Sequence, residues 1–133
     1  MAESKKFQPR KDEIDNWLAR SREALEMAED ELREGYFWGA VGRAYYAMFY
    51  IVKVVLLDRG IITKTHQGTK AKFHEIFIKT KMIPREFGQL FAKAIDKRNK
   101  ADYDIREEWT RKQAEELVKN AREFVKTVKK LIK

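Results

Sequence analysis

Two arginines stand in surroundings where an arginine side chain would need a partner. Arg43 lies in the segment Gly42–Tyr50, whose other residues are glycine, alanine, methionine and aromatics. Arg98 opens the sequence Arg-Asn-Lys-Ala-Asp-Tyr, so in a helix it shares a face with Asp102, four residues later. A buried guanidinium must be paired, and its planar fork of donors suits phosphate and carboxylate groups. The two segments therefore predict an anion-binding site in a helical protein.

Of the two histidines, one is a candidate for binding an anion and the other is not. His66 lies just before an expected helix, where it could meet a phosphate held by the helix N-terminus. The alternative is a loop histidine that is hydrogen-bonded to backbone. His74 falls on a charged helical segment and is interpreted as a surface residue. Because these two histidines lack a matching carboxylate pattern and the chain has no cysteine, we expect no metal site and no cofactor.

Elements that could position these residues are all helical in pattern. Apolar residues recur every three or four positions, no stretch alternates as a strand would, and only six glycines and two prolines interrupt the 133 residues. The pattern predicts main helices over about 11–34, 36–59, 84–100 and 107–130, and a short one over about 69–81. We expect an all-α, up-and-down bundle of four main helices plus one short helix, forming a single domain over residues 1–133 with a polar leader at 1–9.

The second expected helix is apolar over most of its circumference. Such a helix is central in its bundle, or faces a partner as well as its own core, and we therefore expect a homodimer. Its longest apolar run, Ala44–Leu57, is interrupted by Lys53 and is too short for a membrane span. The N-terminus lacks the apolar stretch of a signal peptide, so we expect a soluble, cytoplasmic protein. The net charge of +8 fits an anionic partner, although lysine-rich helical surfaces are common.

Three segments, in order and at suitable spacing, resemble the HEPN domain family, in particular its small stand-alone helical type that is often paired with a minimal nucleotidyltransferase. They are Gly35–Phe49, Thr65–Gly68 and Arg98–Tyr103. The resemblance implies a helical bundle that dimerises. It also implies binding of RNA or nucleotides, often in toxin–antitoxin or defence systems, and many family members are metal-independent RNases.

The RNase motif of the family is an arginine, a polar residue and a histidine a few positions further on. Arg98 and Asn99 match its beginning, but the positions for the histidine hold Tyr103, Asp104 and Ile105. Metal-free RNA cleavage needs a base, an acid and positive charge on the phosphorane. Arg98 could supply the charge, Asp102 a base and Tyr103 a weak acid. The sequence leaves two functions open: a metal-independent RNase, or a non-catalytic module that binds a nucleotide or a nucleotidyltransferase partner.

The remaining site residues also have two interpretations. Arg43, His66 and Asn99 are predicted to bind the ligand, and the resemblance favours a site shared by Arg43 and Arg98. Arg43 could instead cap aromatic packing and pair with an acid such as Asp96 or Asp102. An ion pair between Arg98 and Asp102 could be mainly structural. The tryptophans Trp17, Trp38 and Trp109 are interpreted as core or interface residues rather than as platforms for stacked bases.

Overall fold

Every regular element that the structure describes is helical. The computed structural model describes residues 11–103 and 109–132, except for the side chains of 100–103. The helices are α2 (Lys11–Glu34), α3 (Phe37–Leu57), α4 (His66–Phe73), α5 (Arg85–Tyr103) and α6 (Arg111–Lys129), and a π-helical turn, η1 (His74–Ile78), continues α4. The predicted all-α bundle with one short helix is confirmed. The short helix begins at His66, three residues before its apolar pattern does.

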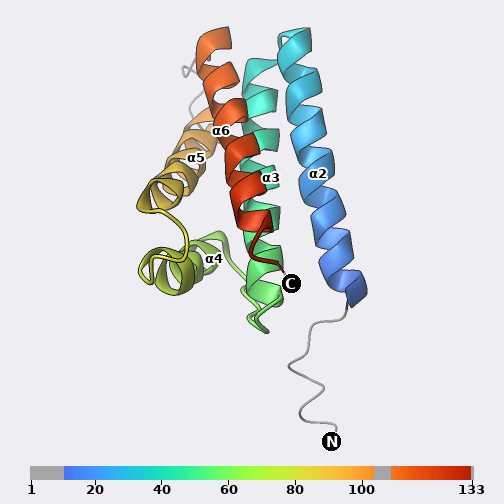
Figure 1. Cartoon of the computed structure of the whole chain (residues 1–133). Coiled ribbons are helices and arrows are strands. Elements are labelled where there is room, and N and C mark those ends of the chain that lie inside the picture. The colour runs from blue at the N-terminus through green and yellow to red at the C-terminus, as the bar shows by residue number, and fades with distance from the viewer. Residues whose placement is uncertain (1–10, 104–108, 133) are drawn as a thin grey trace, which may run out of the picture.

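Helix α3 is the central element. Figure 1 shows α2, α3 and α6 side by side, with α5 leaning away from α6 and α4 beyond the end of α5. α3 contacts all four of the other helices, which confirms the central position predicted from its apolarity. By length and composition alone α3 could cross a membrane, but 72% of its most apolar window is buried inside this protein. Its hydropathy is therefore accounted for by the core.

A cluster of four phenylalanines fixes the short helix against the bundle. Phe73 ends α4, and its ring centroid lies between 5.6 and 5.9 Å from those of Phe77, Phe91 and Phe124. These rings come from η1, α5 and α6, and all four are almost completely buried. Burial of an aromatic side chain and its edge-to-face contacts stabilise a core strongly. The cluster thereby holds the first residue of α4, His66, over the middle of α3.

The helix ends follow from specific residues. Gly35 has φ of +86° and Gly60 has φ of +78°, left-handed conformations that only glycine adopts without strain, and they end α2 and α3. The hydroxyl of Thr65 accepts a hydrogen bond from the backbone N–H of Gly68 and caps α4. Thr110 forms a capping box with Gln113. The expected start of the last helix at 107 was therefore too early, and Thr110 is its cap rather than the first residue of its apolar stripe.

Small residues bring α2 close to α3. The buried residues of α2 are Ser21, Ala24 and Ala28. The Ser21 hydroxyl donates a hydrogen bond of 2.8 Å to the backbone oxygen of Ala47, a carbonyl of the central helix. Larger leucines of α2 pack only at the edges of this contact. The close approach places the polar side of α2 next to the open side of α3, where Arg43 and two tyrosines lie.

Candidate functional site

The centre of the site is a pair of adjacent tyrosines on α3. Tyr45 is completely buried, whereas Tyr46 is half-buried, and their ring centroids lie 5.1 Å apart in an edge-on arrangement. Successive residues of a helix diverge by about 100°, so the two side chains face different neighbours. Tyr45 turns toward α4 and α5, where it contacts His66 and Phe91, and Tyr46 turns toward Tyr50.

Arg98 reaches both tyrosines from α5. Its Nη2 atom donates a hydrogen bond of 2.9 Å to the hydroxyl of Tyr46. Its guanidinium carbon lies 5.3 Å from the ring centroid of Tyr46 and 5.7 Å from that of Tyr45. Contacts of this kind attract a cation to the ring through its quadrupole. Arg98 as a whole is half-buried, and the two tyrosines fix the position of its guanidinium.

His66 enters the same cluster from the first residue of α4. Its Nδ1 atom shares a hydrogen bond of 2.8 Å with the Tyr45 hydroxyl, and its ring centroid lies 4.4 Å from that of Phe49. The sequence left open a hydrogen bond from His66 to the backbone. For Nδ1 the structure shows the hydrogen bond to the Tyr45 hydroxyl instead. Burial lowers the pKa of His66, and the positive charges of Arg98 and Lys53 lower it further. The imidazole is therefore neutral at neutral pH and able to accept a proton.

Tyr45 is a structural partner rather than a titrating group. Burial raises the pKa of Tyr45 far above its ordinary value, and the nearby Arg98 opposes this only in part. The hydroxyl stays protonated and can hold His66 in one orientation. Lys53 of α3 contacts the segment that precedes α4. Its ammonium donates a hydrogen bond to the backbone oxygen of Thr63. Burial lowers the pKa of Lys53.

Arg43 is exposed rather than buried. The apolar segment around it indicated burial, but its side chain is 47% exposed and pairs with Glu31 of α2, with Nε and Oε1 3.4 Å apart. The sequence suggested Asp96 or Asp102 as its partner; the partner that the structure shows is Glu31, and the side chain of Asp102 lies outside the described residues. Position 43 lies on the one narrow side of α3 that the bundle leaves open. Arg43 and Arg98 are linked through Tyr46, which contacts Arg98 and lines a surface groove together with Arg43.

The other predicted residues follow Arg98 along α5. Asn99 is exposed, one residue after Arg98. The side chains of Asp102 and Tyr103 lie outside the described residues, as does the predicted ion pair between Arg98 and Asp102. Among the described residues, no group of three or more histidine, cysteine, aspartate or glutamate side chains could hold a metal ion.

Sequence reasoning missed the residues that bring the site together. Tyr45, Tyr46 and Phe49 appeared in the segment that carries Arg43, but as part of an apolar helix rather than as partners of Arg98 and His66. Their signal was the pair of neighbouring tyrosines, because a buried phenol needs a polar partner for its hydroxyl. The structure supplies those partners from two other helices.

Comparison of the sequence with known proteins places this chain in a family. The model of the HEPN domain matches residues 14–131. A UPF0332 protein of Thermotoga maritima is 32% identical over 119 residues, covering 90% of each chain. Two proteins of Methanocaldococcus jannaschii, named "Putative toxin MJ0142" and "Putative toxin MJ0605", are 33% and 31% identical, covering 92% of this chain and 83% and 91% of their own. This chain is a member of the HEPN domain family.

Proposed function

We propose that this protein binds RNA or nucleotides at the site formed by Arg98 and His66, as a toxin-like component of a toxin–antitoxin or defence system. The observation that carries the proposal is the guanidinium of Arg98, held by two tyrosines at a half-buried position beside His66, whose pKa is lowered by burial and by the charge of Arg98. A guanidinium offers a phosphate two parallel hydrogen bonds, and the histidine can exchange a proton with a neighbouring oxygen. The names of the two Methanocaldococcus relatives support the toxin-like role.

His66 gives the site an acid–base group that the motif around Arg98 lacks. No histidine follows Arg98 at the family positions, and the imidazole that contacts the tyrosine pair comes instead from α4. This arrangement supports slow, metal-independent cleavage of RNA. The missing motif histidine favours the second candidate function, a non-catalytic module that binds a nucleotide or a minimal nucleotidyltransferase partner. The proposed assembly is a homodimer, as the family resemblance implies, and the proposed location is the cytoplasm, as expected from the sequence.

A single conservative substitution tests the anion site. Arg98→Lys keeps the charge but loses the planar fork, so it should weaken RNA or nucleotide binding at least several-fold while the helical circular dichroism spectrum is unchanged. Loss of a charged hydrogen bond of about 1.5–3 kcal/mol accounts for such an effect.

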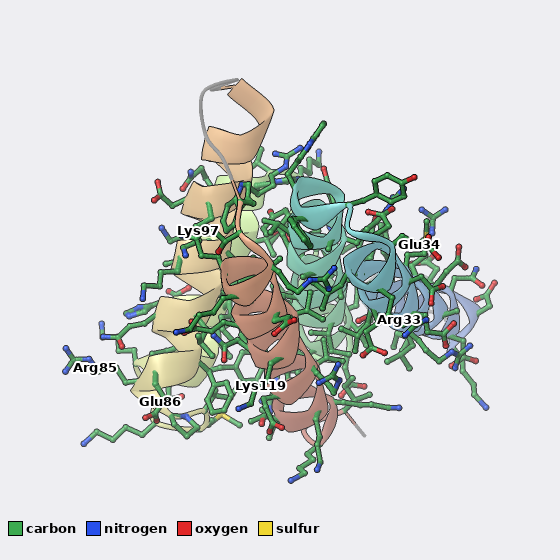
Figure 2. All side chains as sticks on the ribbon, turned by 90° about the horizontal axis from the view of Figure 1, so that it is seen from above. Arg33, Glu34, Arg85, Glu86, Lys97 and Lys119 are labelled. Atoms are coloured by element: carbon green, nitrogen blue, oxygen red, sulfur yellow. The ribbon has the colours of Figure 1, made fainter. Side chains whose placement is uncertain are left out.

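The matched control for this test is Arg85→Lys. Arg85 stands at the start of the same helix and projects away from the bundle (Figure 2). The control should bind like the wild-type protein. Binding that is unchanged in Arg98→Lys would contradict the proposed site.

A further inference from the structure

Aromatic side chains form a continuous row that leads away from Arg98 along α3. The ring centroid of Tyr46 lies 5.7 Å from that of Tyr50, and Tyr50 lies 5.4 Å from Trp17 of α2. At the other end, Tyr46 lies 6.2 Å from His66. Tyr46, Tyr50 and Trp17 are all half-buried, so the row reaches the surface along its length. The row therefore differs from the phenylalanine cluster of the core, whose rings are almost completely buried.

Positive charges accompany this row. The guanidinium of Arg20 and the ammonium of Lys53 lie 5.6 and 5.7 Å from the ring centroid of Trp17. Arg43 stands one helical turn before Tyr46, and Arg98 bonds to the hydroxyl of Tyr46. Four cations thus flank three aromatic rings, over a path that runs from α2 to α5.

A groove between α2 and α3 lies in the middle of the path. Its volume is about 420 Å³, and its walls include Arg20, Arg43, Tyr46 and Tyr50. Glu23 is the one acidic residue that lines it, and Arg43 is already neutralised in part by Glu31. The groove therefore combines aromatic side chains with positive charge, and Tyr46 joins it directly to the proposed anion site.

We infer that this groove binds an unpaired stretch of RNA, whose bases stack on Tyr50 and Tyr46 and whose phosphates are held by Arg20, Arg43 and Arg98. Single-strand binding surfaces combine cations that follow the backbone with aromatic rings that accept any base. A duplex cannot use such rings, because its bases are already stacked and paired. The inference rests on the proposed function and adds to it a second contact surface, the groove whose tyrosines and arginines hold the bases and phosphates next to the Arg98 site.

Substitutions of Tyr50 test the stacking. The probes are a fluorescein-labelled 12-nucleotide single-stranded RNA and the same sequence as a blunt duplex, titrated in anisotropy. The wild-type protein should prefer the single strand. Tyr50→Leu keeps apolar volume without an aromatic face and should weaken single-strand binding by roughly 5- to 100-fold, the effect of one stacked base. Tyr50→Phe should bind like the wild-type protein. Ile62→Ala, at an exposed apolar residue that does not line the groove, is the surface control.

A variant that lacks two arginines of the groove tests the phosphate contacts without changing a buried side chain. Arg20→Gln combined with Arg43→Gln should weaken binding and reduce its dependence on salt, since fewer phosphates are neutralised. Arg33→Gln is the matched control, because Arg33 is a similarly exposed arginine of α2 that pairs with Asp30. Figure 2 labels it beside Glu34, at the end of α2.

The outcomes separate this inference from the proposed function. If Arg98→Lys loses binding but Tyr50→Leu and the double arginine variant do not, the anion site stands and the groove is not part of it. Equal binding of duplex and single strand would also overturn the inference. If Tyr50→Leu leaves RNA binding intact but changes the molar mass in light scattering, a second copy of this chain covers the groove instead. If the wild-type protein binds neither RNA nor mononucleotides, the proposed function fails as well.

Discussion

His66 is held in a position where its protonation opposes folding. Its pKa in the folded protein is lowered by burial, Arg98 and Lys53. A depressed pKa means that the unfolded chain binds the proton more readily, so stability rises with pH through the interval between the folded and unfolded values. The contribution of His66 is complete above about pH 6.5, the ordinary histidine value, and declines as the pH falls below it.

We therefore predict that the thermal stability of the wild-type protein falls between pH 7.5 and pH 5 more steeply than that of His66→Gln. Melting curves by circular dichroism across this range measure the difference. His74→Gln provides the control, because His74 is an exposed residue of η1 and the variant should keep the wild-type slope. Identical pH profiles for His66→Gln and the wild-type protein would show that His66 is not held in this way.

The chemistry expected of the site is modest and needs no divalent ion. We predict that cleavage of single-stranded RNA is slow, persists in EDTA, and is lost in Arg98→Lys because an ammonium cannot make the two parallel hydrogen bonds to the phosphorane oxygens that a guanidinium makes. His66→Gln should slow it by about 10²–10⁴-fold, the usual contribution of a general acid or base. Gel analysis of labelled RNA with and without EDTA measures this. Fast cleavage that EDTA abolishes would contradict the assignment.

How far the sequence predicts the site is clearest at Arg43, Tyr45 and Tyr46. The sequence named Arg98 and His66 as candidate site residues, and the structure places both against the same tyrosine pair, but the apolar setting of Arg43 was mistaken for burial. Apolarity is a property of the whole helix, whereas burial depends on which side each residue faces. Arg43, Tyr46, Tyr50 and Lys53 recur at three- and four-residue intervals along one open side of α3, and only the packing of the other helices shows that this side is uncovered.

At the scale of elements, the apolar pattern predicted each of the α-helices that the structure describes. The observed boundaries differ from the predicted ones where residues at the helix ends act as caps. Thr110 shows why: its spacing fits the apolar stripe of the last helix, but its side chain accepts the backbone hydrogen bond that begins α6. Periodicity does not distinguish a capping threonine from an inward-facing one. The start of α4 at His66 was missed for the same reason, since Thr65 caps it before its apolar residues begin.

The cap of α6 should be measurable in the stability of the whole bundle. Thr110→Ala removes the acceptor for the Gln113 N–H and should lower the free energy of unfolding by about 1 kcal/mol. Thr110→Ser keeps the acceptor and should retain most of the stability. Urea denaturation followed by circular dichroism compares the three proteins. Equal midpoints for the alanine variant and the wild-type protein would show that α6 does not depend on this cap.

At the scale of the whole molecule, the reason first given for dimerisation needs revision. The apolar surface of α3 appeared larger than one small bundle could cover, yet most of that helix is buried by its own chain. Among the residues that the structure describes, the large apolar side chains that stay exposed are Tyr36, Trp38, Ile62 and Met82, each at least 43% exposed. Trp38 is therefore not a core residue, and its interpretation as an interface residue stays a prediction.

Tyr36 and Trp38 lie together at the N-terminal end of α3, where they line a surface cavity of about 660 Å³ with Phe37 and Trp109. Exposed tryptophans beside other aromatics are typical of the residues that contribute most to protein interfaces. We predict that light scattering finds a homodimer at micromolar concentrations. Trp38→Ala should weaken the dimer, so that the variant is a monomer at the lower of these concentrations. Ile62→Ala, beyond the opposite end of α3, should leave the dimer intact. A wild-type protein that is monomeric at all concentrations would contradict the dimer. A dimer that tolerates Trp38→Ala would place the interface elsewhere on the bundle.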